Sequence, residues 1–154
     1  MTRRLWVVCT LAALYLSAPP AVADFASATS AYDSGDYATA FREWRRLAEA
    51  GDTNSQIALA GLYRSGIGRG IDFVRAAHWY GRAAQSGNAI AQLNLAEMYE
   101  HGWGVKRDVV LAFIWYHRAA AQGRTWAADQ REKLAKTMTV AQIEAAQRHL
   151  STSN

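Results

Sequence analysis

The chain has 154 residues, of which 51% are hydrophobic and 19% are charged, and its formal net charge is +4. Its single cysteine and its two prolines all lie within the first 20 residues, which excludes a small scaffold held by disulfides. Residues 24–154 carry 15 Lys and Arg against 13 Asp and Glu, a net charge of +2, so we expect no nucleic-acid partner.

Residues 1–23 have the pattern of a secretory signal peptide. Arg3 and Arg4 precede an apolar run from Leu5 to Leu16, and Ala21-Val22-Ala23 provides a small-x-small cleavage site. The run is shorter than the roughly 20 residues that span a bilayer, which disfavours a retained anchor. We therefore expect cleavage after Ala23, a periplasmic or secreted protein, and no stable membrane insertion of the single domain formed by residues 24–154.

Residues 24–51 have the pattern of an abbreviated repeat whose positions correspond to those 36 residues later. Asp36 corresponds to Asp72, Trp44 to Tyr80 and Gly51 to Gly87. The turn between the two helices of this unit is five residues shorter than in the units that follow, because the Gly-x-Gly segment is missing. We expect this unit to cap the N-terminal end of a stack of repeats.

Residues 52–87 and 88–123 are two complete repeats, and each is expected to be a pair of helices. The first helices are predicted near Thr53–Ser65 and Ala89–His101, capped by Asp52 and Asn88. The second helices are predicted near Asp72–Ser86 and Asp108–Gln122. Identical pairs at this spacing include Leu59/Leu95, Ala60/Ala96, Tyr63/Tyr99, Gly66/Gly102, Gly68/Gly104, Asp72/Asp108, Ala76/Ala112, Trp79/Trp115, Tyr80/Tyr116, Arg82/Arg118, Ala83/Ala119, Ala84/Ala120 and Gly87/Gly123.

Residues 124–154 are expected to be a capping helix pair, with Thr139–Leu150 as the partner of Thr125–Lys136. Thr139 and Gln142 match a capping box at the start of the last helix. Val140, Ile143, Ala146 and Leu150 form its apolar stripe.

The segment LAGLYRSGIGRGIDFVRAAHWYGRAAQSGN and its second copy LAEMYEHGWGVKRDVVLAFIWYHRAAAQG resemble the Sel-one-like repeat family, relatives of the tetratricopeptide repeat. The resemblance implies an all-α fold, a right-handed α/α solenoid of about eight helices. It also implies a non-enzymatic adaptor or regulator that binds a partner protein or peptide, in an envelope complex or a signalling pathway. A cysteine-rich branch of the family is linked to β-lactam binding or hydrolysis, but residues 24–154 lack its disulfides.

In proteins of this fold the first helix of each pair lines a concave groove, so the resemblance also implies a binding surface. It has mixed charge, an apolar floor and an aromatic side chain near one end, a composition that suits an extended peptide or a partner helix. The candidate binding residues are Asn54, Ile57, Gly61 and Arg64, then Ile90, Leu93, Glu97 and Glu100, and finally Trp126, Asp129 and Lys133.

Two other functions stay open from the sequence. Glu97, Glu100 and His101 lie close together at a helix end, so the chain could be a binder or hydrolase of cell-wall or β-lactam-like ligands. It could also be a structural subunit of a homo-oligomer. A metal site needs three or four converging ligands, and residues 24–154 contain no recognisable nucleophile motif. We therefore expect no catalytic residue, no metal and no cofactor.

Three recurring features are interpreted as structural. The aromatic pairs Trp79–Tyr80 and Trp115–Tyr116 recur at the repeat period, which indicates packing between helices rather than a ligand cage. The glycines of residues 66–70 follow a predicted helix, so they indicate a turn and not a phosphate-binding loop. Arg46, Arg82 and Arg118 are expected near helix C-termini, where a cation complements the helix dipole.

Overall fold

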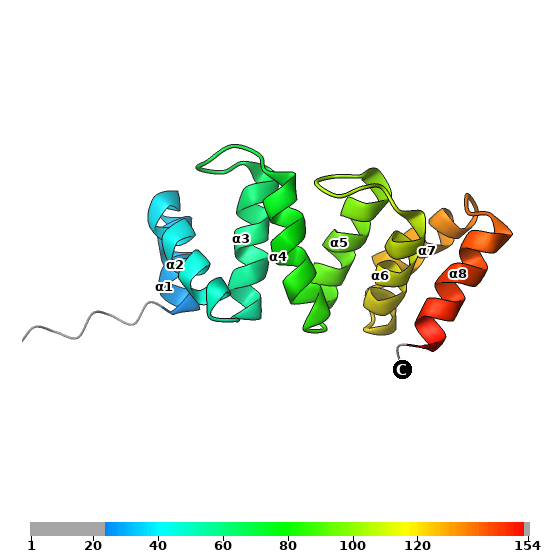
Figure 1. The fold of residues 1–154 in the computed structure, drawn as a ribbon. Helices are drawn as coiled ribbons and strands as arrows, with labels where there is room; N and C mark the ends of the chain where they lie inside the picture. The colour runs from blue at the N-terminus through cyan, green and yellow to red at the C-terminus, as the bar shows by residue number, and fades with distance from the viewer. Residues whose placement is uncertain (1–23, 153–154) are drawn as a thin grey trace, which may run out of the picture.

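The fold comes from a computed structural model, which describes residues 24–152. These residues form eight α-helices and no strand, so the expected all-α solenoid of about eight helices is confirmed (Figure 1). The helices are α1 Phe25–Asp33, α2 Tyr37–Glu49, α3 Thr53–Ser65, α4 Phe73–Gln85, α5 Ala89–His101, α6 Val109–Ala121, α7 Thr125–Ala135 and α8 Val140–Ser151. The predicted signal peptide lies outside the described residues.

Helix boundaries follow the predicted capping residues. Asp52 accepts a hydrogen bond from the backbone of Ser55 at 2.7 Å at the start of α3, and Asn88 caps α5 in the same way. Asp36, Asp72 and Asp108 begin α2, α4 and α6 as expected. These bonds satisfy backbone N–H groups that have no partner within the first turn of a helix. The capping box at the start of α8 is also present.

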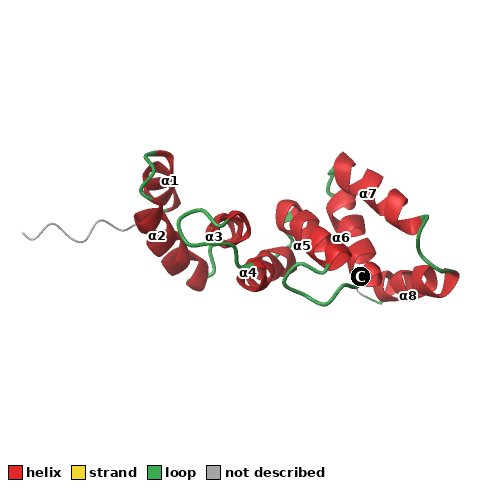
Figure 2. Cartoon of the chain, turned by 90° about the horizontal axis from the view of Figure 1, so that it is seen from above, coloured by secondary structure: helices red, strands yellow, loops and turns green. Residues whose placement is uncertain are grey.

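The helices stand side by side in a single row, and each helix from α1 to α6 packs on the next one (Figure 1). Seen from above, α1, α3, α5 and α7 lie along one side of this row, which curves toward that side (Figure 2). We call these the A helices, and α2, α4 and α6 the B helices.

Small residues and bulky residues each recur in the core at the 36-residue spacing. Ala40, Ala76 and Ala112 are fully buried. Tyr80 and Tyr116 pack among them as predicted, 3% and 1% exposed. Burial on this scale stabilises the fold because each aromatic side chain removes about 150–250 Å² from water.

Two kinds of contact join one repeat to the next. Buried glutamines at equivalent positions, Gln56 and Gln92, donate to the Ala48 and Ala84 carbonyl oxygens at 3.2 and 3.3 Å. These carbonyls lie near the C-terminal ends of α2 and α4, where backbone acceptors lack helical partners. The glutamines therefore fasten α3 to α2 and α5 to α4, a role that the sequence analysis did not assign to them.

The long loops between the A and B helices make the second kind of contact. Gly104, in the α5–α6 loop, lies against the backbone of Phe73 at the start of α4. Trp103 beside it stacks on the Phe73 ring, with centroids 5.6 Å apart, and stays 38% exposed. One repeat earlier, Gly68 lies against Tyr37 at the start of α2. Each loop thus reaches back to the preceding B helix, and residues 66–70 form the predicted turn.

α8 corrects the expected pairing of the last two helices. It packs on α6 and not as the partner of α7, and α6 lies between α7 and α8 (Figure 2). The physical reason lies in α7. Two apolar residues of α3, Leu59 and Tyr63, correspond by repeat position to Arg131 and Ala135 in α7. At these two positions α7 therefore offers a smaller apolar surface than α3 does.

The packing of α8 on α6 makes the surface of α6 differ from those of α2 and α4. Ile114 is 2% exposed, whereas Arg42 and His78 are exposed at the equivalent positions of α2 and α4. Because α7 packs on α6 as α5 packs on α4, the element that differs is α8, and we infer that α8 covers Ile114. Only part of its predicted apolar stripe is buried, since Ala146 is fully buried and Val140 is 76% exposed.

Candidate functional site

The candidate binding residues all lie on the A helices, and these helices lie along the inner side of the curved row (Figure 2). α3 carries Asn54, Ile57, Gly61 and Arg64, α5 carries Ile90, Leu93, Glu97 and Glu100, and α7 carries Trp126, Asp129 and Lys133. Ile57 and Leu93 are half-buried against the core. Ile90 and Trp126 are 41% and 45% exposed, which is high for large apolar side chains. We call this set of residues the A face.

The centre of the A face holds an ion pair between neighbouring repeats. Arg64 on α3 donates to Glu97 Oε2 on α5 at 3.2 Å, and both side chains remain partly exposed. Both charges act on the Tyr80 hydroxyl: burial raises its pKa above the ordinary value, Arg64 opposes the shift and Glu97 adds to it. A B-helix tyrosine therefore reaches between two A helices toward the charged pair.

The same arrangement recurs one repeat later with different partners. The Tyr116 hydroxyl donates to Glu100 Oε2 at 2.7 Å. Burial, followed by this hydrogen bond, raises the pKa of Tyr116, so its hydroxyl stays protonated and Glu100 is fixed as an acceptor. Trp126 of α7 packs against the Tyr116 ring edge-on at 6.3 Å. The A face thus carries two positioned carboxylates and two exposed apolar side chains.

The glutamate and histidine cluster does not converge on a common point. Glu97 pairs with Arg64, Glu100 accepts from Tyr116, and the His101 ring packs on Trp103 with centroids 4.6 Å apart. No group of three or more His, Cys, Asp or Glu side chains within residues 24–152 is placed to hold a metal ion. The three side chains therefore have separate partners and do not form one site.

The hollows of the surface lie on the other side of the row, and sequence analysis did not identify them. One, of about 500 Å³, is lined by α2 and Arg69, and another, of about 440 Å³, is lined chiefly by α4 with Leu95, Tyr99, Val105 and Trp115. Their linings correspond at the 36-residue spacing, with Arg69 of the first replaced by Val105 of the second. A repeat alignment of the B-helix and loop positions would have revealed them.

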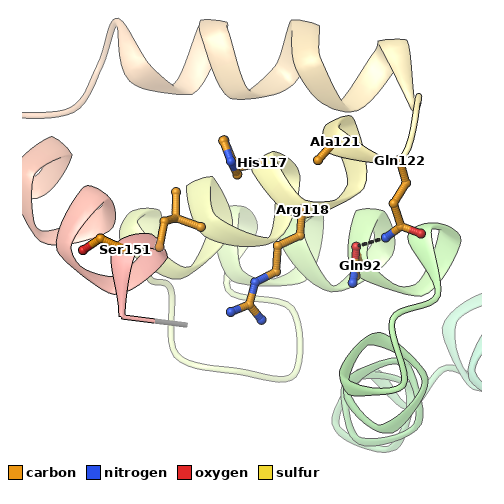
Figure 3. A pocket seen from close by; sticks show the side chains of 7 residues that line it. Gln92, His117, Arg118, Ala121, Gln122 and Ser151 are labelled. Carbon is orange, nitrogen blue, oxygen red and sulfur yellow. Dashed lines mark hydrogen bonds between the residues drawn. The ribbon is translucent and has the colours of Figure 1, made fainter. Parts of the chain in front are cut away.

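A third hollow, of about 580 Å³, lies between α6 and the end of α8 (Figure 3). Its lining includes Arg118 and His117 of α6, and a hydrogen bond of 2.9 Å joins Gln122 to Gln92 at one side. Burial lowers the pKa of His117, and neighbouring Arg131 and Arg118 lower it further. This histidine is therefore held toward its neutral form, which makes it a poor anion ligand.

Arg46, Arg82 and Arg118 lie in the last turns of α2, α4 and α6, as expected. Arg82 lies over the Trp79 ring at 5.1 Å and Arg118 lies over the Trp115 ring at 4.8 Å. Both are in the last turn of their helices, where a cation interacts favourably with the helix dipole.

Comparison with known proteins identifies the family. Sel1 repeats match residues 53–88 and 89–123. A Sel1 repeat protein from Oxalobacter formigenes, of solved structure, is 35% identical, and the match covers 72% of this chain and 90% of that one with a TM-score of 0.65. The chain belongs to the Sel1 repeat family. Proteins of this family are generally non-enzymatic scaffolds for protein interactions.

A second solved structure shares the Sel1 repeat fold over more of the chain. It is c5321, a protective antigen present in uropathogenic Escherichia coli strains, 27% identical with a TM-score of 0.75. The match covers 80% of this chain and 27% of the antigen, so this chain spans about a quarter of that protein. A comparison with curated proteins gave no match. None of the helices in residues 24–152 is both long and apolar enough to cross a membrane.

Proposed function

We propose that this Sel1 repeat protein is an exported adaptor that binds a partner protein or peptide on its A face. The observation that carries the proposal is the combination, on one set of helices, of positioned polar groups with exposed apolar side chains. Arg64 and Glu97 are held by each other, and Glu100 is held by Tyr116. Ile90 and Trp126 stay exposed beside them.

Such a surface has the composition of a protein interface. Aromatic and arginine side chains contribute most to binding when a partner desolvates them, and the surrounding polar groups fix the register of the partner. Because Glu97 and Glu100 are oriented before binding, little side-chain entropy is lost when a partner contacts them. A partner segment with basic and apolar side chains would complement the carboxylates and the exposed Trp126.

Export is the second part of the proposal and rests on the pattern of residues 1–23. Full-length protein produced in a Gram-negative host is expected to appear in the periplasm with Asp24 as its first residue. Intact-mass measurement of the purified protein checks this. A cytoplasmic product that retains residues 1–23 would contradict export without affecting the binding proposal.

The partner is tested by in-cell crosslinking of the tagged protein, followed by mass spectrometry. The variant Arg64→Glu, Glu97→Lys, Glu100→Lys reverses the charges of the A face. A protein captured by the wild type is expected to fall by at least about tenfold with the variant, because like charges then oppose the partner at several contacts.

A matched control changes the same types of charge away from the A face: Lys106→Glu, Asp33→Lys and Glu144→Lys, all at exposed positions. This variant is expected to capture the partner as well as the wild type. Equal loss from both variants would show that net charge, and not the A face, determines binding. The double variant Arg64→Glu, Glu97→Arg tests the surface further, since it keeps an ion pair within the protein but exchanges the two positions.

A further inference from the structure

A basic hollow lies on α2, away from the A face. It has a volume of about 500 Å³ and is lined by Ala38, Phe41, Arg42, Arg45, Arg46, Glu49 and Arg69. Four of these seven residues are arginines. Two glutamates lie close to them, since Arg42 and Arg46 pair with Glu43 and Arg45 pairs with Glu49 at 3.1–3.5 Å. Four positive charges against two negative ones leave the hollow with a net charge of +2.

The fold does not require these arginines. At the equivalent hollow one repeat later, Arg42, Arg45 and Arg69 are replaced by His78, Gly81 and Val105, and the same helices pack in the same way. Only the Arg46 position keeps its cation, as Arg82. The basic character of the first hollow is therefore a property of this unit alone.

Arg69 is positioned without a carboxylate partner. It extends from the α3–α4 loop, and its guanidinium lies over the Phe41 ring, 4.0 Å from the ring centroid. No ion pair of Arg69 occurs within residues 24–152. The neighbouring Gly68 fixes the loop by its contact with Tyr37. A stacked guanidinium keeps its five N–H donors available in the plane of the group.

We propose that this hollow binds a short acidic segment of a partner protein, with a carboxylate pairing with Arg69. The site is separate from the A face. It would give the protein a second contact surface that selects acidic segments, whereas the A face is proposed to select basic and apolar ones. A carboxylate accepts two parallel hydrogen bonds from one guanidinium, and an adjacent apolar side chain of the segment would cover Ala38 and the edge of Phe41.

The composition of the hollow favours an acidic peptide over a polyphosphate or a nucleic acid. A net charge of +2 is small for a polyanion, whose binding needs many phosphate contacts. Phe41 and Ala38 provide an apolar floor that a phosphate chain would not use. The arginines of the wall already hold the carboxylates of Glu43 and Glu49, so their geometry suits this ligand.

The experiment is an NMR titration of ¹⁵N-labelled residues 24–154 with the peptide ELEELEELE, at about 50 mM salt so that screening stays weak. The expected result is chemical-shift change at α2, at residues 66–70 and at the Arg69 side-chain Nε–H. The variants Arg69→Gln and Arg42→Gln are each expected to weaken binding about three- to fivefold, as exposed ion pairs contribute. Lys106→Gln, an equal charge change in the next loop, is expected to leave affinity unchanged.

Three further measurements decide between sources of binding. The twin peptide QLQQLQQLQ is expected not to bind, and inorganic phosphate is expected not to compete. No shift change up to about 5 mM peptide, equal weakening by Lys106→Gln, or shift changes confined to the A face would each overturn the proposal. Binding of phosphate at the same residues would replace the acidic peptide by a phosphorylated ligand. The A-face variant Glu97→Lys, Glu100→Lys separates this site from the proposed function, since it should bind the peptide at the hollow unchanged.

Discussion

Replacing Gly104 by alanine is expected to lower the free energy of unfolding by about 2–5 kcal/mol. Gly104 has a φ of +68°, a conformation that costs a residue with a Cβ about 1–2 kcal/mol. In addition, a Cβ at this position would overlap the carbonyl group of Phe73 and the backbone nitrogen of Val74. Neither group is a flexible side chain, so the α5–α6 loop must move away from α4. Urea-induced unfolding of the two proteins, followed by circular dichroism, measures the difference.

Two other glycines separate backbone strain from the loss of this contact. Gly70 also has a positive φ, +87°, but a Cβ there meets nothing within 4 Å, so Gly70→Ala is expected to cost only about 1–2 kcal/mol. Gly68→Ala should fall between the two, because its Cβ would lie 3.1 Å from Tyr37 Cβ, a tight contact that a movement of a few tenths of an ångström would relieve. Equal losses in all three variants would mean that the loops do not tie neighbouring repeats together.

The helices and their ends were predictable because their signals are local. Capping residues such as Asp52 and Thr139 act within three residues of their position, and the 36-residue period transfers each assignment to the next unit. The loop contact of Gly104 with Phe73 was not predicted, because it joins positions about 30 residues apart. The same holds for the glutamine bonds from Gln56 and Gln92 to the preceding helix, although their repetition at the period was a usable signal.

The placement of α8 shows how the repeat pattern misled the prediction. The capping box and the apolar stripe located this helix correctly but say nothing about its neighbour. Arg131 and Ala135 in α7 carried that information, since they stand where α3 and α5 have residues that pack on a B helix. Ile114 also gives α6 an apolar side chain where α2 and α4 carry Arg42 and His78, which favours the packing of α8 on α6.

The candidate site could be predicted in part, because the repeat period transfers residue positions from one unit to the next. Repeat register placed the proposed residues on the A helices, but the partners of Arg64 and Glu100 come from other helices. The pairing of Arg64 with Glu97 depends on the distance between α3 and α5, and the Tyr116 hydroxyl reaches Glu100 from the B helix α6. Only the packing of three helices brings these groups together, and no single segment of sequence contains that information.

Ile114→Ala is expected to lower the free energy of unfolding by about 2–5 kcal/mol, the usual cost of truncating a fully buried isoleucine. Its side chain is 2% exposed, and the cavity would open beneath α8. The matched control is His78→Ala, which changes the equivalent position of α4, where the side chain is exposed. That variant should lie within about 0.5 kcal/mol of the wild type.

A truncated protein that ends at Met138 turns this comparison into a test of α8 itself. Without α8, Ile114 would face solvent, so Ile114→Ala should then cost less than about 1 kcal/mol. The difference between the two backgrounds measures the coupling between Ile114 and α8 in the manner of a double-mutant cycle. If Ile114→Ala cost the same with and without α8, the side chain would be buried by α7, and the packing of α8 on α6 would contribute little to stability.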